Sequence, residues 1–170
     1  MRDYISINRA ANLHPKIRQE VAALIDLAET KFPKTVAIRI VQDLRTIEEQ
    51  DALYAQGRTR PGKIVTKAPG GKSYHNYGLA IDFALMYDMD GNGTFETLSW
   101  DTLKDFDKDG ESDWKEVVKV FKQAGYEWGG DWTSIKDDPH LQKTFGLSVS
   151  QLFQMYKDKK RIPGTPYVQI

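Results

Sequence analysis

The chain has 170 residues, of which 40% are hydrophobic, and its 24 Lys and Arg balance its 24 Asp and Glu. This length and composition predict one globular domain with a sizeable core, and the zero net charge argues against nucleic acid as a partner, because phosphate binding usually needs a basic excess. The absence of cysteine excludes a thiolate nucleophile, a cysteine-ligated zinc site and a disulfide framework.

The first half of the chain predicts helices that alternate with strands. Apolar residues at helical spacing indicate a helix over 15–32, and alternating apolar residues indicate a strand over 36–40. A capping box that begins at Thr46 opens the next predicted helix, over 45–57. Residues 58–73 are rich in Gly, Pro and Lys, and we expect a loop there.

The second half continues the alternation. Residues 79–83 predict a strand, residues 114–121 an amphipathic helix, residues 126–134 a short strand and turn, and residues 152–156 a last helix. The final stretch, 157–170, has two prolines, a glycine and a charge run, and is predicted to be a tail or linker. This order of elements indicates an α+β domain.

Two of the three histidines and a strand aspartate are candidate metal ligands. His75 precedes the second strand, and Asp82 lies on the strand face opposite the apolar residues, where an acid is costly unless it is paired or bound to a metal. His140 would complete a His2Asp site for zinc, which commonly takes three protein ligands and leaves one position for water. His14 is expected at the surface or in a helix cap. By spacing alone, a hydrogen-bonded core pair is the more common explanation of His75 and Asp82.

The full motif around these residues is more specific than the spacing of His75 and Asp82 alone. Residues 73–82 read S-x-H-x-x-G-x-A-x-D, which resembles the signature of the M15 zinc peptidases, the D-Ala-D-Ala carboxypeptidase and dipeptidase family. The flanking residues 45–83 and the stretch 128–142 resemble the L-alanyl-D-glutamate peptidase branch, found in phage endolysins and related cell-wall enzymes. The resemblance covers about residues 5–145, and it implies zinc held by all three candidate ligands.

The same resemblance implies a fold and a domain plan. We expect a compact single-domain α+β fold, with a small central antiparallel sheet flanked by helices and an inserted acidic loop. The catalytic domain is predicted over 1–156, with the insertion at about 88–116.

The resemblance also implies catalytic roles. In the family, an acid three residues before the last histidine takes the water proton and passes it to the leaving amine; here that residue is Asp137. Many relatives carry the longer Glu at this position. Asp138 is the alternative base, and a solvated acidic loop is the simplest explanation of both. Arg45 resembles the arginine that stabilises the developing oxyanion, although a surface arginine that opens a helix is the alternative.

Further residues are predicted to line the substrate pocket. Gln50 and Ser73 resemble its polar residues. A wall of the cleft is expected to be shaped by Trp128, Gly129, Gly130, Asp131 and Trp132, although the two tryptophans could equally belong to the core.

An acidic stretch predicts a second metal site. Residues 105–116, DFDKDGESDWKE, match the calcium-loop pattern D-x-D-x-D-G-x5-E in full. The predicted ligands, which include the backbone carbonyl of the first glutamate, are Asp105, Asp107, Asp109, Glu111, Asp113 and Glu116. The alternative is an acidic solvated loop. A second stretch with Asp88, Asp90 and Asn92 starts in the same way, but Ser99 replaces the bidentate glutamate, so it is a weaker calcium site or a turn.

These patterns predict a zinc peptidase that cleaves the L-alanyl-D-glutamate bond of peptidoglycan, as a phage endolysin does. The N-terminus lacks the apolar region of a signal peptide, so we expect the enzyme to wait in the host cytoplasm until a holin releases it to the cell wall or periplasm. We expect a monomer without membrane insertion, and calcium that either shapes the loop or regulates activity. The alternatives are a D-Ala-D-Ala carboxypeptidase of the same superfamily and a non-catalytic calcium-binding wall module.

Overall fold

A five-stranded antiparallel sheet forms the centre of the computed structural model, which describes residues 1–170. The sheet order is β1-β2-β5-β4, and β3 pairs with the C-terminal half of β2 on the same side as β5. The strands are β1 (Val36–Gln42), β2 (Ala80–Tyr87), β3 (Thr97–Ser99), β4 (Glu127–Trp128) and β5 (His140–Gln142). The predicted α+β fold with a small antiparallel sheet is therefore confirmed.

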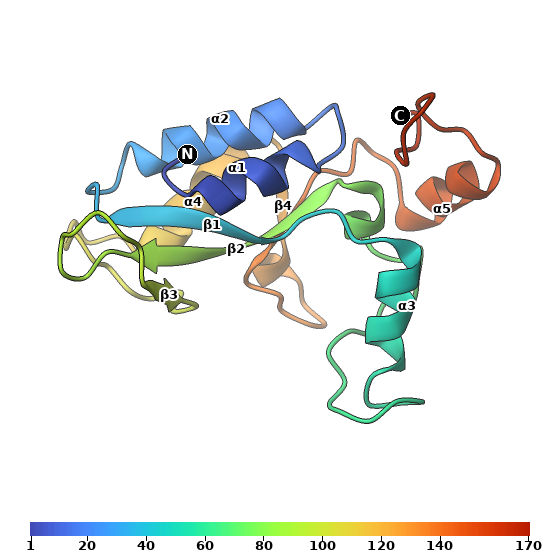
Figure 1. The fold of residues 1–170 in the computed structure, drawn as a ribbon, viewed down its shortest axis with the longest axis horizontal. Helices are drawn as coiled ribbons and strands as arrows, with labels where there is room; N and C mark the ends of the chain where they lie inside the picture. The colour runs from blue at the N-terminus through green and yellow to red at the C-terminus, as the bar shows by residue number, and fades with distance from the viewer.

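Helices pack on one face of this sheet, and one helix projects away from it (Figure 1). The α-helices are α1 (Tyr4–Ala11), α2 (Arg18–Glu29), α3 (Ile47–Ala55), α4 (Asp113–Gln123) and α5 (Val149–Lys157), and the short 3-10 helices are η1 (Tyr74–Tyr77) and η2 (Gly129–Asp131). Helices α1 and α2 contact β1, and α4 packs beside α2, while α3 and the loop after it extend from the body. No helix has both the length and the apolar character that crossing a membrane requires.

Alternation along β2 separates the core from the functional face. Ile81, Phe83 and Leu85 are buried in the same apolar cluster as residues of α2 and α4. Burying side chains of this size contributes about 1.5–3 kcal/mol each, which makes this face the main stabilising layer. Because successive strand residues point to opposite faces, Asp82 is directed away from the helices.

The observed helices differ from the predicted ones at one set of boundaries and by one additional helix. The predicted helix over 15–32 spans only Arg18–Glu29, with turns at both of its ends. The capping box at Thr46 is present, since its side chain accepts from the backbone of Glu49. Helix α1 is not predicted by the sequence: its N-cap carboxylate, from Asp3, also pairs with Arg39 of β1, which is a tertiary contact.

The C-terminal segment 157–170 differs from the expected tail or linker. Tyr167 donates a hydrogen bond to the carbonyl of Asn12 at 2.8 Å, and Val168 is fully buried. His14, expected at the surface or in a helix cap, is also buried, with Nε2 2.9 Å from the carbonyl oxygen of Val168. The apolar end of the segment packs against the N-terminal region. The charge run before it does not indicate this packing.

Candidate functional site

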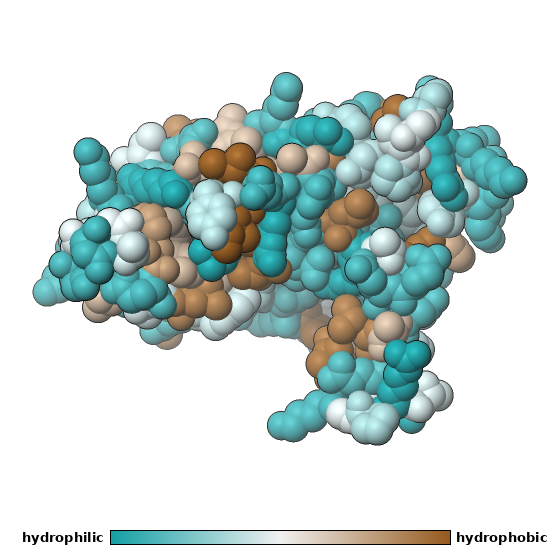
Figure 2. Space-filling view, viewed as in Figure 1, coloured by the Kyte–Doolittle hydropathy of each residue, from teal (hydrophilic) through white to brown (hydrophobic).

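A cleft of about 920 Å³ opens on the sheet face that carries Asp82. One wall is the loop after α3, residues 64–68, and another is the segment 132–137. Figure 2 shows hydrophobic groups where the projection formed by α3 and its loop joins the body. Ile64 and Ile135 lie in these walls and are about half exposed. The cleft is therefore open, and apolar groups flank its polar centre.

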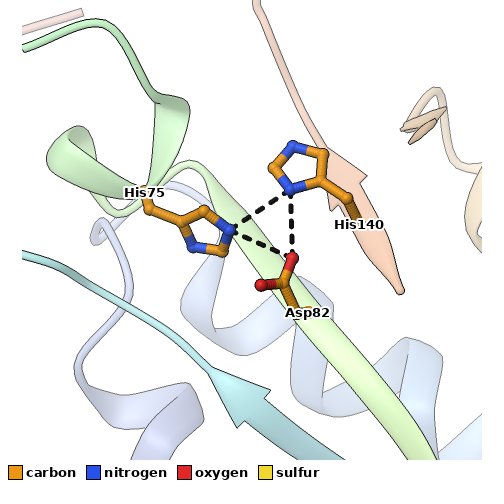
Figure 3. A group of neighbouring side chains, drawn as sticks. All are labelled: His75, Asp82 and His140. Atoms are coloured by element: carbon orange, nitrogen blue, oxygen red, sulfur yellow. Dashed lines mark hydrogen bonds and ion pairs between the residues drawn. The ribbon is translucent and has the colours of Figure 1, made fainter. Parts of the chain in front are cut away.

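The three predicted zinc ligands meet in this cleft (Figure 3). Asp82 on β2 and His140 on β5 are directly paired in register, so their side chains project from the same face. Their neighbours Ile81 and Leu141, also paired, point into the core. His75 reaches the same point from η1. The pairing of β2 with β5 thus brings together side chains that are far apart in the sequence.

The turn that carries His75 is fixed by its own caps. The Ser73 hydroxyl accepts a hydrogen bond from the backbone N–H of His75 at 3.3 Å. Gly78 ends the turn in the left-handed conformation, with φ of 65°, and a Cβ atom there would lie 2.8 Å from the backbone nitrogen of His14. The serine and glycine of the S-x-H-x-x-G pattern therefore have geometric causes.

The ligand atoms form a nearly equilateral triangle. His75 Nε2 lies 3.1 Å from Asp82 Oδ1 and 3.2 Å from His140 Nδ1, and His140 Nδ1 lies 3.0 Å from Asp82 Oδ1. Tetrahedral zinc with bonds of about 2.0–2.1 Å needs ligand atoms about 3.3 Å apart. The observed triangle fits the ion after a small outward movement.

Outer hydrogen bonds determine which ring nitrogens face the centre. His75 Nδ1 lies 2.9 Å from the carbonyl oxygen of Asp43, which can only accept, so this nitrogen carries the proton. Gln142 donates to the Glu127 carboxylate at 2.8 Å, which turns its amide oxygen toward His140 Nε2 at 2.9 Å. Both inner nitrogens are therefore unprotonated in the neutral rings, and three lone pairs converge as a metal cation requires.

The electrostatics favour positive charge at the same point. Burial alone would raise the pKa of Asp82, but the two histidines hold it well below its usual range. Burial works to lower the pKa of His140, whereas the hydrogen bond and charge of Asp82 raise it overall. The partly buried carboxylate of Asp82 favours a proton on His140 when no cation is near, and a divalent ion would take the same place.

Asp137 and Asp138 have different surroundings. Asp137 lines the cleft, and burial, followed by the negative charge of Asp82, raises its pKa. Asp138 does not line the cleft, and its backbone carbonyl accepts a hydrogen bond from Trp128 Nε1 at 2.7 Å. This geometry favours Asp137 as the acid–base group.

Arg45 lines the cleft and is held from two directions. Its Nη1 donates to the side-chain oxygen of Gln50 at 2.9 Å, and its backbone carbonyl accepts from the Asn76 amide at 3.0 Å. Gln50 is buried and also donates to the carbonyl of Ala68 at 2.8 Å in the cleft wall. Gln50 therefore positions Arg45 and the wall, and it is not among the residues that line the cleft.

Of the five residues predicted in the cleft wall, only Trp132 lines it. Trp128 packs against the core, and Asp131 is paired with Lys122 at 2.6 Å on the exposed surface. Trp132, predicted in the same wall, does line the cleft, with its ring centroid 5.2 Å from that of His140. The chain turns at η2, so neighbouring side chains leave in different directions.

The stretch 105–116 forms a loop that leads into α4. Asp105, Asp107 and Asp113 each offer a carboxylate oxygen within 4.8 Å of the others. Gly110 takes φ of 98°, which suits the sharp turn that the pattern places there. Asp109, a predicted ligand, instead accepts from the backbone N–H of the predicted carbonyl ligand, Glu111, at 2.8 Å.

Glu116, the last residue of the pattern, is the unusual member. Its side chain is only 5% exposed, and its Oε2 atom has no hydrogen-bond partner. Burial, followed by the charge of Asp109, raises its pKa to about 7. Its nearest cation is Lys31, with the Nζ atom 3.9 Å from the other carboxylate oxygen. A buried, unpartnered carboxylate is costly, and a cation in the loop would relieve that cost.

In the weaker acidic stretch, backbone N–H groups donate to the first carboxylate. The Asp88 carboxylate accepts from the backbone N–H groups of Gly91, Asn92 and Gly93 at 2.8–3.2 Å. Asp90 lies nearby, in a group with Asp88 and Glu96. These bonds describe a turn stabilised by its own backbone.

A His2Asp cluster, with an aspartate and an arginine in the same cleft, is the arrangement of a metal-dependent hydrolase. A family model described as D-alanyl-D-alanine carboxypeptidase matches residues 66–143, which include the three candidate ligands and Asp137. The chain is 48% identical, over 132 residues, to the peptidoglycan L-alanyl-D-glutamate endopeptidase CwlK of Bacillus subtilis (strain 168), and the match covers 78% of this chain and 74% of the relative. The chain therefore belongs to the M15 peptidase family.

Two more distant relatives extend this comparison. The chain is 28% identical, over 158 residues, to the L-alanyl-D-glutamate peptidase of Listeria phage A118; the match covers 88% of this chain and 48% of that protein, so the chain spans about half of its length. The crystal structure of the Serratia marcescens L-Ala D-Glu endopeptidase ChiX aligns with a TM-score of 0.52 at 22% identity, covering 84% of this chain and 88% of the other. This last likeness supports the fold.

Several residues that build the site carry no recognisable signal in the sequence. Asp43 contributes only a backbone carbonyl, which no side-chain pattern can reveal. Asn76 and Gln142 lie within the matched stretches but have polar side chains of ordinary type. Glu127 becomes relevant only because β4 pairs with β5 and brings it beside Gln142.

Proposed function

We propose that the chain is a zinc peptidase that hydrolyses the amide bond between L-alanine and D-glutamate in peptidoglycan stem peptides. The observation that carries this proposal is the convergence of two unprotonated ring nitrogens and one carboxylate oxygen beside Asp137. The identity of the bond rests on the 48% identity with a relative named for that cleavage.

Each residue of the cleft has a separate task in this proposal. His75, Asp82 and His140 would hold zinc, which supplies Lewis-acid activation of a carbonyl and of water when bound. Asp137 takes a proton from the attacking water and delivers it to the leaving amine. Arg45, a permanent cation, faces the negative charge that develops on the carbonyl oxygen.

The open shape and charge of the cleft support a peptide substrate with free carboxylates. Three lysines line the cleft in addition to Arg45: Lys67, Lys72 and Lys136. Stem peptides carry carboxylates along their length, and lysines at the walls can pair with them. The half-exposed Ile64 and Ile135 offer apolar contact to short alkyl groups.

The test is mass spectrometry of purified peptidoglycan digested with the zinc-loaded protein. We expect peptides with new D-glutamate amino ends, no products after zinc chelation, and no products with Asp137→Ala. Release of free D-alanine without new D-glutamate ends would identify a D-Ala-D-Ala carboxypeptidase instead. Intact peptidoglycan in every reaction would support the non-catalytic wall module.

We propose, as a separate point, that the loop 105–116 binds one calcium ion. The support is the buried, unpartnered oxygen of Glu116, together with the carboxylates of Asp105, Asp107 and Asp113, which offer oxygen atoms within 4.8 Å of one another. Isothermal titration with calcium should give one site that Glu116→Gln weakens and Glu48→Gln, an exposed glutamate of α3, leaves intact. Equal affinity in both variants would remove Glu116 from the site.

We also propose that the enzyme reaches the wall only after release from the cytoplasm. The relationship to a phage enzyme supports a role in lysis. Expression in host cells should leave them intact until the membrane is permeabilised, and Asp137→Ala should prevent lysis afterwards. Lysis without permeabilisation would contradict this route.

A further inference from the structure

Two tryptophans share one backbone carbonyl next to the candidate base. Trp128 Nε1 donates to the carbonyl oxygen of Asp138 at 2.7 Å, and Trp114 Nε1 donates to the same oxygen at 3.3 Å. A carbonyl oxygen has two lone pairs, so both are used. Trp114 is fully buried, with its ring tilted against Phe83 at 4.3 Å between centroids.

The surrounding bonds fix the backbone on either side of this carbonyl. The Asp137 N–H donates to the carbonyl of Gly129 at 3.1 Å, and the Pro139 carbonyl accepts from the N–H of Phe83 at 3.1 Å. The approach at Gly129 is so close that a Cβ atom there would lie 2.4 Å from the carbonyl oxygen of Asp137. With the peptide units on both sides held, the Asp137 side chain has only its own rotamers free.

Trp114 belongs at the same time to the acidic loop. It lies in the first turn of α4, between the loop ligands Asp113 and Glu116. The carboxylate of Asp113 is bonded on both oxygens, to the hydroxyl of Tyr87 at 2.8 Å and to the N–H of Phe106 at 3.1 Å. Trp114 therefore bridges the acidic loop and the segment 137–139, although these two segments are far apart in the sequence.

We propose that Trp114 is a positioning residue that transmits the state of the acidic loop to Asp137. This inference rests on the proposed peptidase function and on calcium binding by the loop. Calcium favours the arrangement in which the first turn of α4 is ordered, and that turn places the indole N–H on the Asp138 carbonyl. A ligand shifts an equilibrium only by binding one state better, and the carboxylates of Asp113 and Glu116 supply that difference. Without the ion, Trp128 alone holds the carbonyl.

Phenylalanine substitutions separate this role from simple packing. Trp114→Phe keeps an aromatic ring in the core but removes the N–H donor, and Trp100→Phe is the matched control because Trp100 is 51% exposed. In the zinc-loaded enzyme with calcium, we expect Trp114→Phe to lower kcat by about three- to tenfold, the effect of one lost hydrogen bond, with KM and zinc content unchanged. Calcium should raise kcat of the wild type and of Trp100→Phe but not of Trp114→Phe.

Hydrogen exchange of the unmodified, zinc-loaded enzyme provides a test that needs no variant. We expect calcium to slow exchange of the His140 amide, which is bonded to the Asp137 carbonyl at 3.0 Å. The coupling is overturned if exchange there is insensitive to calcium, or if kcat of Trp114→Phe still responds to it. An active wild type that ignores calcium also overturns the coupling and leaves the peptidase function intact, whereas a wild type that cuts no peptidoglycan overturns the proposed function itself.

Discussion

The two candidate metal sites of this protein are assembled in different ways. The zinc candidates His75, Asp82 and His140 come from a turn and two strands, and each histidine is oriented by a separate outer partner. The carboxylates of the loop 105–116 come from one continuous segment, and several of them bond to backbone N–H groups of that segment. The first cluster therefore depends on the pairing of distant strands, whereas the carboxylates of the second come from one stretch of sequence.

This difference supports the proposed division between a catalytic site and a calcium-binding loop. A site that the sheet and its outer hydrogen bonds hold in place is preorganised, as a catalytic metal centre requires. A loop on the surface with one buried, unpartnered carboxylate can change its order when an ion binds. The experiments below break each cluster in turn.

The largest effect is expected from removal of a zinc ligand. His140→Ala should abolish both zinc binding and peptidoglycan hydrolysis, because two protein ligands hold the ion too weakly. Metal analysis and mass spectrometry of digests would measure this. His14→Asn is the control histidine variant, and it should keep zinc; a His140→Ala protein with one zinc per chain would exclude the ligand assignment.

Loss of the base should separate catalysis from metal binding. Asp137→Ala is expected to keep its zinc and to lose about 10²- to 10⁴-fold in kcat, the usual contribution of general acid–base catalysis. Asp138→Ala retains the backbone carbonyl that both indoles contact, so its kcat should stay near that of the wild type. The reverse result would exchange the two roles.

The outer hydrogen bonds should matter for affinity. Gln142→Leu removes the acceptor for His140 Nε2, and zinc affinity should fall by about 10- to 100-fold, as for other outer partners of metal ligands. Competition with a chromogenic chelator would measure it. Gln154→Leu on the exposed side of α5 is the control, and equal affinities in the two variants would show that Gln142 does not orient the histidine.

Calcium binding by the acidic loop should change the thermal stability of the protein more than it changes the zinc content. Calcium at 100 times its dissociation constant stabilises by about 2.7 kcal/mol, which should raise Tm by roughly 5–10 °C for a chain of this size. Glu116→Gln should lose most of that rise, and Glu48→Gln none of it. A calcium-induced rise that survives in Glu116→Gln would place the ion elsewhere.

The smallest effect concerns a residue outside both clusters. Burial lowers the pKa of His14, so the folded state favours the neutral ring. The stability that this provides is complete above the unfolded pKa of about 6.5 and is lost as pH falls toward the lower folded value. Between pH 7.5 and 5, Tm should fall more for the wild type than for His14→Gln in thermal scans, and parallel curves would contradict this assignment.

Local patterns in the sequence determined much of this protein. The capping box at Thr46, the amphipathic spacing of α2 and α4, and the acid-glycine pattern of 105–116 depend on neighbours a few residues away, so they can be read directly. The motif over residues 73–82 is local in the same sense. The turn at Gly78 and the alternation of β2 fix the spacing of the candidate zinc ligands His75 and Asp82.

Only the tertiary structure decided how these pieces meet. Strand pairing between β2 and β5 joins Asp82 to His140, and the turn at η2 sends Trp132 into the cleft and Trp128 into the core. The roles of Gln142 and Trp114 likewise arise from contacts between distant segments. Such contacts are set by the burial and pairing of whole elements, and for this reason a sequence read in short windows specifies the ligands of this site but not the residues that hold them.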